Sequence, residues 1–195
     1  MLGRGPRDVG APEYEIESAL HLIEDLRMGG IDRGVDLAGF AVGVGAGWYA
    51  PPRLRRSDLL LAFLACPSDG HDLDQIRIMK GMFLLSKEGP PEVRHLFAFE
   101  PYHYGPFDKR VYSDLDALEL AGLVASEQLS GQNRRLFRPT GAGKRRAREI
   151  ETSFSPEVAR KVREIKQLVT SMSFLQLLRY VYQRHPAYAV RSRVS

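Results

Sequence analysis

The sequence is poor in the residues that build disulfide frameworks and membrane spans. Its 195 residues include one cysteine, Cys66, so an internal disulfide is excluded and a reducing compartment is favoured. No charged start is followed by an uninterrupted apolar run, and we therefore expect no secretory signal. The most apolar stretch, residues 35–52, carries Asp36 and four glycines and falls short of a membrane-spanning helix. These absences predict a cytoplasmic protein without a membrane segment.

Motifs for metals, cofactors and catalysis are also missing. No metal-binding spacing connects the five histidines, which are His21, His71, His95, His103 and His185. Residues 141–144 resemble the end of a phosphate-binding loop, but Arg138 replaces its first glycine and Arg145 its magnesium-binding Ser or Thr. No serine lies in a nucleophile elbow, and the carboxylates are distributed as on helix surfaces. We therefore expect no metal, no cofactor and no enzyme.

The composition that remains is that of a globular protein. Hydrophobic residues make up 44% of the chain and charged residues 27%, which fits one principal domain with appendages. We expect an N-terminal extension over residues 1–56, with one short helix and a glycine-rich connector, a domain over 57–154, and a helical segment over 155–195. The net charge of +4 permits nucleic-acid binding without requiring it.

The helix expected after residue 105 is the most informative element. Phe107, Val111, Leu115 and Leu118 recur at spacings of three and four, which places them on one helix face. Because proline in the first helical turn loses no needed hydrogen-bond donor, we expect the helix to begin at Pro106.

A basic hairpin follows this helix. Residues 123–129 and 134–139 read as two strands joined by turn chemistry at 130–133, and Thr140 is expected to cap a helix over 142–150. Earlier helices are expected over 58–65, capped by Ser57, and over 74–86. The predicted fold is α+β, mainly α: a winged helix-turn-helix with a two-stranded wing and an appended C-terminal helical pair. The first helix of that pair is expected to open at Ser155-Pro156-Glu157 and to carry an apolar stripe of Val158, Val162, Ile165 and Val169. The pair is expected to be either a lid on the domain or a dimer interface.

Several of these segments carry a family resemblance. They are residues 76–85, the sequence Tyr-His-Tyr-Gly-Pro-Phe at 102–107, and residues 115–123, 137–141, 178–182 and 185–188. Together they resemble the YwgA-like winged-helix family and, more distantly, are similar to the Panacea domain of SocA-like antitoxins. Tyr104, Gly105, Pro106 and Phe107 form the core of the shared motif. The resemblance implies a small prokaryotic protein of regulation or toxin neutralisation, without catalytic residues.

Basic residues cluster behind the predicted recognition helix. Between positions 131 and 148 there is no acidic residue, and the seven basic ones are Arg134, Arg135, Arg138, Lys144, Arg145, Arg146 and Arg148. The alternative to phosphate contact is a solvated surface whose arginine stems cover apolar groups. The expected DNA-binding residues are Lys109, Arg110, Tyr112, Ser113, Arg134, Arg135, Arg138, Lys144 and Arg145.

Acidic residues on the predicted recognition helix oppose base-specific reading, and the aromatic residues before it offer a second possible binding surface. Asp114, Asp116 and Glu119 on the same predicted helix oppose the phosphate charge. Tyr102, His103 and Tyr104 could form a stacking platform for a nucleotide or a peptide. We expect instead that Tyr102 and Tyr104 share a core face of a strand and that His103 points away from it.

The sequence therefore favours a DNA-binding winged-helix protein that regulates transcription, paired as a homodimer through its C-terminal helices. The alternative is a protein-interaction module of antitoxin or proteolytic-adaptor type, with a partner such as a toxin.

Overall fold

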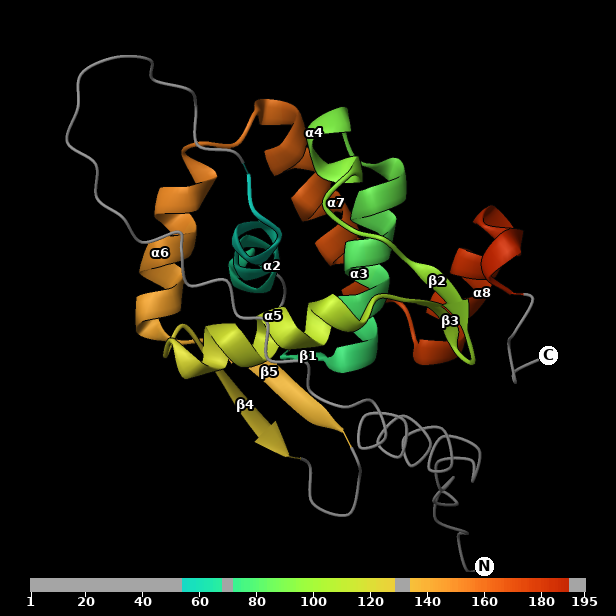
Figure 1. Ribbon diagram of the computed structural model, residues 1–195, viewed down its shortest axis with the longest axis horizontal. Helices are drawn as coiled ribbons and strands as arrows, with labels where there is room; N and C mark the ends of the chain where they lie inside the picture. The colour runs from blue at the N-terminus through green and yellow to red at the C-terminus, as the bar shows by residue number, and fades with distance from the viewer. Residues whose placement is uncertain (1–53, 68–71, 129–133, 190–195) are drawn as a thin grey trace, which may run out of the picture. The chain divides into compact units, whose positions relative to one another are not determined.

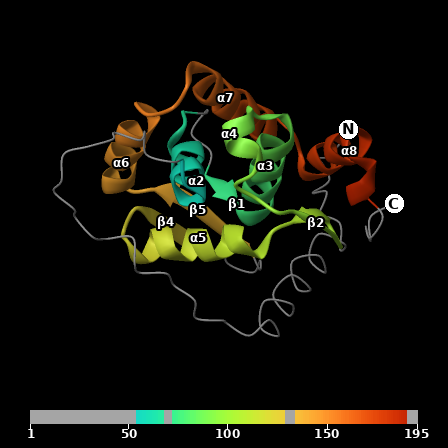
Figure 2. The same cartoon turned by 45° about the horizontal axis from the view of Figure 1, so that its top comes forward.

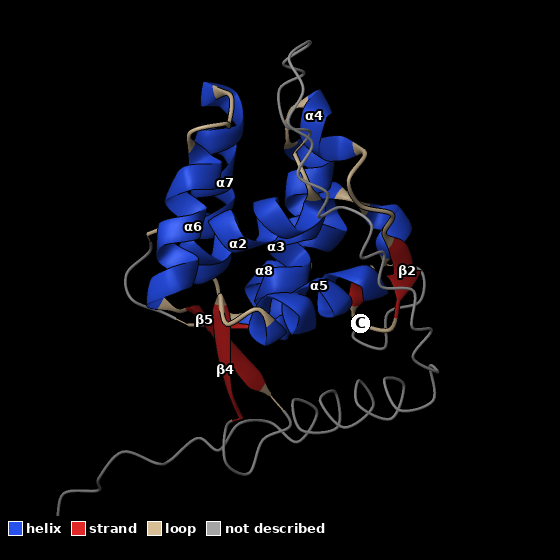
Figure 3. Ribbon diagram, turned by 60° about the vertical axis from the view of Figure 1, so that its left-hand side comes forward, coloured by secondary structure: helices blue, strands red, loops and turns tan. Residues whose placement is uncertain are grey.

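The computed structural model describes residues 54–67, 72–128 and 134–189. Within these residues the chain is mainly helical, with two small antiparallel sheets (Figure 3). The helix and connector expected in the N-terminal extension, and the expected turn at 130–133, lie outside the described residues. The coarse fold class, α+β and mainly α, is therefore confirmed.

One sheet joins strands that are distant in sequence. The elements in chain order are α2 (Arg56–Ala65), β1 (Leu73–Asp74), α3 (Gln75–Glu88), α4 (Pro91–Arg94), β2 (Glu100–Tyr102), β3 (Gly105–Phe107), α5 (Lys109–Leu120), β4 (Val124–Gln128), β5 (Arg135–Pro139) and α6 (Gly141–Glu151). The three-stranded sheet has the order β1-β5-β4, with Leu73 opposite Phe137. The second sheet is the hairpin of β2 and β3 (Figure 1).

Helix α2 lies at the centre of the core. Its sequence is apolar on every side, and the side chains from Leu59 to Leu64 are all buried. A helix of this kind must be surrounded by other elements. Helices α5, α6 and α7 and strand β5 all contact it, and it is seen end-on in the middle of Figure 1.

The capping residues read from the sequence mark several helices correctly. The side chain of Thr140 accepts a hydrogen bond from the Gly143 N–H, and that of Ser155 accepts one from the Val158 N–H. Asp74 caps α3, where the sequence places a helix over 74–86. Helix α2 instead begins at Arg56, so the cap predicted at Ser57 is wrong.

The start predicted at Pro106 is also wrong. Gly105 and Pro106 belong to β3, and α5 begins at Lys109 behind an Asp108 cap. Gly105 adopts a φ of +86°, which favours glycine and closes the hairpin turn. Because His103 and Tyr104 occupy that turn, Tyr102 and Tyr104 do not share one face of a strand, contrary to the prediction.

The C-terminal helices pack on this core. Helix α7 (Pro156–Ser171) lies beside α3 and buries Val158, Val162, Ile165 and Val169, as Figure 2 lets the reader follow. Helix α8 (Phe174–Arg184) and the short 3₁₀ helix η1 (Pro186–Tyr188) complete the described chain. The apolar stripe predicted on α7 is thus used within the chain. Among the residues the structure describes, no helix combines the length and apolarity needed to cross a membrane.

Candidate nucleic-acid interface

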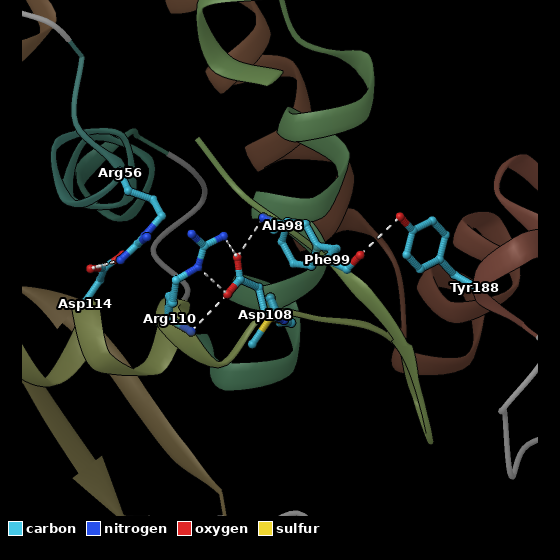
Figure 4. A network of polar contacts seen from close by, with 8 residues as sticks. Arg56, Ala98, Phe99, Asp108, Arg110, Asp114 and Tyr188 are labelled. Atoms are coloured by element: carbon cyan, nitrogen blue, oxygen red, sulfur yellow. Dashed lines mark hydrogen bonds and ion pairs between the residues drawn. The ribbon is translucent and has the colours of Figure 1, made fainter. Parts of the chain in front are cut away.

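Asp108 fixes the start of helix α5. Its carboxylate accepts hydrogen bonds from the backbone N–H groups of Arg110 and Ala98, both at 3.0 Å (Figure 4). It also forms an ion pair with the Arg110 guanidinium at 2.7 Å. Burial raises the pKa of Asp108, but these hydrogen bonds outweigh it and hold that pKa below its ordinary value. Arg110, expected from the sequence to contact DNA, is therefore part of the helix cap.

The acidic residue Asp114 is neutralised from α2. Arg56 donates to its two carboxylate oxygens at 2.5 and 2.9 Å, in a bidentate arrangement (Figure 4). The Asp114 side chain is only 15% exposed, so its charge faces Arg56 rather than the solvent. Sequence reasoning treated this carboxylate as an obstacle to DNA, because a pair separated by 58 residues leaves no local signal.

A second network joins α5 to the strands β4 and β5. Arg135 donates to Glu119 Oε2 at 2.5 Å and to Ser126 Oγ at 2.7 Å, and Ser126 Oγ donates to Glu119 Oε1 at 2.6 Å. The hydrogen bond from Ser126, with the nearby positive charge of Arg135, lowers the pKa of Glu119. The Arg135 guanidinium also lies over the Phe137 ring, 4.9 Å from its centroid, and 3.5 Å from Asp116. Arg135 therefore connects α5 to strands β4 and β5 within the fold.

The two other arginines of the predicted wing differ in exposure. Arg138 is 55% exposed and lies 3.4 Å from Glu127 and 3.7 Å from Asp72. Arg134 stands immediately before β5 and is partly buried. The tip between the two strands lies outside the described residues.

Helix α6 presents several exposed positive charges. Lys144, Arg145 and Arg148 are exposed and make no ion pair with the described part of the chain, whereas Arg146 pairs with Glu149 at 2.9 Å. The N-terminus of α6 is anchored beside the C-terminal end of α5, because Thr140 Oγ donates to the Gly122 carbonyl at 2.7 Å. Gly143 permits this approach, since a Cβ there would meet the Leu123 carbonyl oxygen. Cations therefore stand next to that end of α5.

The solvent face of α5 contains residues that the sequence list included and others that it missed. Lys109 and Ser113 are exposed, as are Asp116, Ala117 and Leu120. Tyr112 differs, because its ring packs 5.6 Å from that of Phe107 and burial raises its pKa. The spacing of these residues in the sequence could have predicted this face. The predicted DNA contacts on this helix were confined to its first turn, because the helix was expected to begin at Pro106.

The Tyr-Gly-Pro motif is a packing feature. The Lys80 ammonium, buried on α3, donates to the Pro106 carbonyl at 3.0 Å, and a Cβ on Gly105 would lie 3.1 Å from the Tyr182 ring. Burial lowers the pKa of Lys80 to about 7. Tyr102 stacks on His103 and Phe107, with centroid separations of 4.6 and 5.0 Å. The motif thus holds the hairpin against α3 and α8.

The described residues contain no cluster of three His, Cys, Asp or Glu side chains able to hold a metal ion. No model of a known protein family matches the chain, and no curated protein matches it in sequence.

Proposed function

We propose that this protein is a winged-helix regulator of transcription that binds duplex DNA and has no catalytic activity. The observation that carries the proposal is the order of elements, in which α2, β1, α3, α5, β4 and β5 follow one another and the sheet order is β1-β5-β4. This is the order expected for a winged helix, with α4 and the β2-β3 hairpin inserted between its second and third helices. In such a domain α5 is the recognition helix and β4 and β5 form the wing.

The charge distribution supports the proposal. Arg56 and Arg135 compensate Asp114 and Glu119 within the chain, so these two acids oppose the phosphates less than their number suggests. The cations without a partner among the described residues include Lys109 at one end of α5, and Lys144 and Arg145 near its other end. Positive charges near both ends of a helix suit two runs of phosphates on either side of a groove.

The predicted residues divide into two roles. Lys109, Ser113, Arg138, Lys144 and Arg145 are proposed to contact DNA, together with Arg134, which stands immediately before β5. Arg110, Tyr112 and Arg135 are proposed to hold α5 and the wing in position, because each is engaged within the fold.

One specific observation supports a second proposed function, that of a protein-interaction module. The Leu120 side chain is 92% exposed, which also suits a protein-interaction module of antitoxin or adaptor type. The resemblance to YwgA-like and SocA-like proteins is compatible with either function. The two functions differ in whether duplex DNA is the ligand.

A matched pair of charge reversals tests the proposal. Fluorescence anisotropy with a random-sequence duplex should show that Lys144→Glu plus Arg145→Glu abolishes binding. Arg163→Glu plus Arg179→Glu makes the same change in net charge at exposed positions on α7 and α8 and should retain most of the affinity. Equal losses in both variants would show that overall charge alone drives binding, and absence of binding by the wild type at low salt would reject the proposal.

A further inference from the structure

The solvent face of α5 is a stripe with a polar and an apolar half. Lys109, Ser113, Ala117 and Leu120 follow one another at spacings of three and four residues, so they lie in one line along the helix. The opposite face, with Val111, Leu115 and Leu118, is buried in the core. The line therefore points away from the fold from one end of α5 to the other.

Leu120 has no packing role within the described residues. It is the one large apolar side chain among them recorded as exposed, at 92%. Its neighbours Ala117, Ala121 and Gly122 are small and exposed, so Leu120 stands out from the helix. A single exposed leucine is common on protein surfaces, and its position on this face is what gives it meaning.

The charges around Leu120 point to a polyanion as the occupant of this face. Lys109 lies at the start of the stripe, and the exposed Lys144 and Arg145 lie on the helix that is anchored beside Gly122. Of the acids on α5, Asp114 and Glu119 are held by Arg56 and Arg135, and the exposed Asp116, one turn before Leu120, lies 3.5 Å from the Arg135 guanidinium. A ligand with negative charge along two edges and apolar groups between them matches this pattern.

Duplex DNA has that combination in its major groove. Phosphates line both edges, and the floor of the groove displays the C5-methyl group of thymine, which is read by apolar contact. The groove is about 12 Å wide and admits an α-helix. The apolar half of the stripe matches thymine methyl groups, as its polar half matches base and phosphate oxygens.

We propose that Leu120, with Ala117 beside it, contacts thymine C5-methyl groups and makes the protein prefer A·T pairs under the C-terminal half of α5. This inference rests on the proposed function. It assigns a specificity-determining role to a residue that lacks any polar means of reading bases.

The test removes methyl groups from the DNA without changing its hydrogen bonds. Duplexes are first selected from a random library with the full chain, and the tightest binder is then made with each thymine replaced in turn by deoxyuridine. At one or two positions within the bound site, the substitution should weaken wild-type binding about fourfold, the loss expected for one buried methyl group. Replacements in the flanking sequence serve as the control and should have no effect.

The Leu120→Ala variant completes the test. Because Leu120 is exposed, this variant should fold as the wild type does, which thermal unfolding can verify. It should bind the thymine duplex more weakly and lose the difference between thymine and deoxyuridine at the sensitive positions.

The outcomes separate this inference from the proposed function. Sequence-specific binding with no sensitive thymine, or with the same sensitivity in Leu120→Ala, would overturn the inference and leave DNA binding intact. Failure to bind any duplex would overturn both, and would favour a protein partner for this face.

Discussion

At the scale of single residues, the basic side chains divide by whether the fold already uses them. Arg56, Arg110 and Arg135 each hold a carboxylate of the same chain, whereas Lys144 and Arg145 have no such partner among the described residues. A paired arginine contributes to stability, and an unpaired exposed one is available for a ligand. Composition alone cannot make this distinction for Arg56 and Arg135, because their partners are 58 and 16 residues away in sequence.

This division predicts effects of unequal size for two arginines of the basic cluster, Arg135 and Arg145. Arg135→Ala should lower the free energy of unfolding by about 1–2 kcal/mol, since Glu119 and Ser126 lose the hydrogen bonds that Arg135 donates and the Phe137 ring is uncovered. Arg145→Ala should change it by less than about 0.5 kcal/mol. Urea denaturation monitored by circular dichroism measures both values, and equal effects of the two variants would contradict the assignment.

Lys80 predicts how stability depends on pH. Burial lowers its pKa to about 7, below the ordinary value of 10.5, so between these values the unfolded chain binds a proton that the folded chain does not. The folded state therefore gains stability as the pH rises above about 7, by up to roughly 1.4 kcal/mol per pH unit. Below pH 7 this gain is absent.

The comparison with Lys80→Met isolates that contribution. Lys166, whose pKa burial lowers to about 8, adds a rise of the same sign in both proteins. The free energy of unfolding should thus increase more steeply with pH in the wild type than in Lys80→Met between pH 6.5 and 9. Parallel pH profiles would show that Lys80 is charged in the folded state.

At the scale of elements, local sequence signals succeeded where the chemistry is local. The caps at Thr140 and Ser155 were predicted correctly, because a side-chain hydroxyl and the N–H that it satisfies are three residues apart. The start of α5 was not, because proline fits a first helical turn and an extended strand equally well. Residues 105–107 form a strand because they pair with β2 and because Lys80 donates a hydrogen bond to the Pro106 carbonyl. Both interactions come from residues outside 105–107.

Gly105 in the β2-β3 hairpin and Gly122 after α5 predict unequal costs for substitution by alanine. Both Gly105 and Gly122 have positive φ, at +86° and +68°, so alanine is strained at either position. A Cβ at Gly105 would also press on the Tyr182 ring at 3.1 Å, whereas nothing lies within 4 Å at Gly122. Gly105→Ala should cost about 2–3 kcal/mol and Gly122→Ala about 1 kcal/mol. Thermal unfolding of the two variants tests this, and a larger cost at Gly122 would refute it.

At the scale of the whole molecule, the sequence located the basic region but not its organisation. The cluster over residues 134–148 was visible as a run without acids. The placement of α6 beside the end of α5, and the apolar half of the α5 face, depend on tertiary contacts such as that of Thr140 with Gly122. The sequence therefore predicted the positive charge of the candidate surface but not the arrangement of α5 and α6 that forms it.

The C-terminal helices illustrate the same limit. An amphipathic stripe on α7 suits both a lid and a dimer interface, since each buries an apolar face. The structure buries Val158, Val162, Ile165 and Val169 within the chain. A homodimer through these helices stays a prediction and would have to use their remaining faces.

The most direct test of DNA binding through the α5 and α6 cations is a salt titration of the wild-type protein with duplex DNA, followed by anisotropy. Four or more phosphate contacts predict that the logarithm of the association constant falls with the logarithm of salt concentration at a slope of about −3.5 or steeper. Lys144→Ala should reduce the magnitude of that slope by about 0.9. A slope near zero, or one that Lys144→Ala leaves unchanged, would contradict this assignment of the surface.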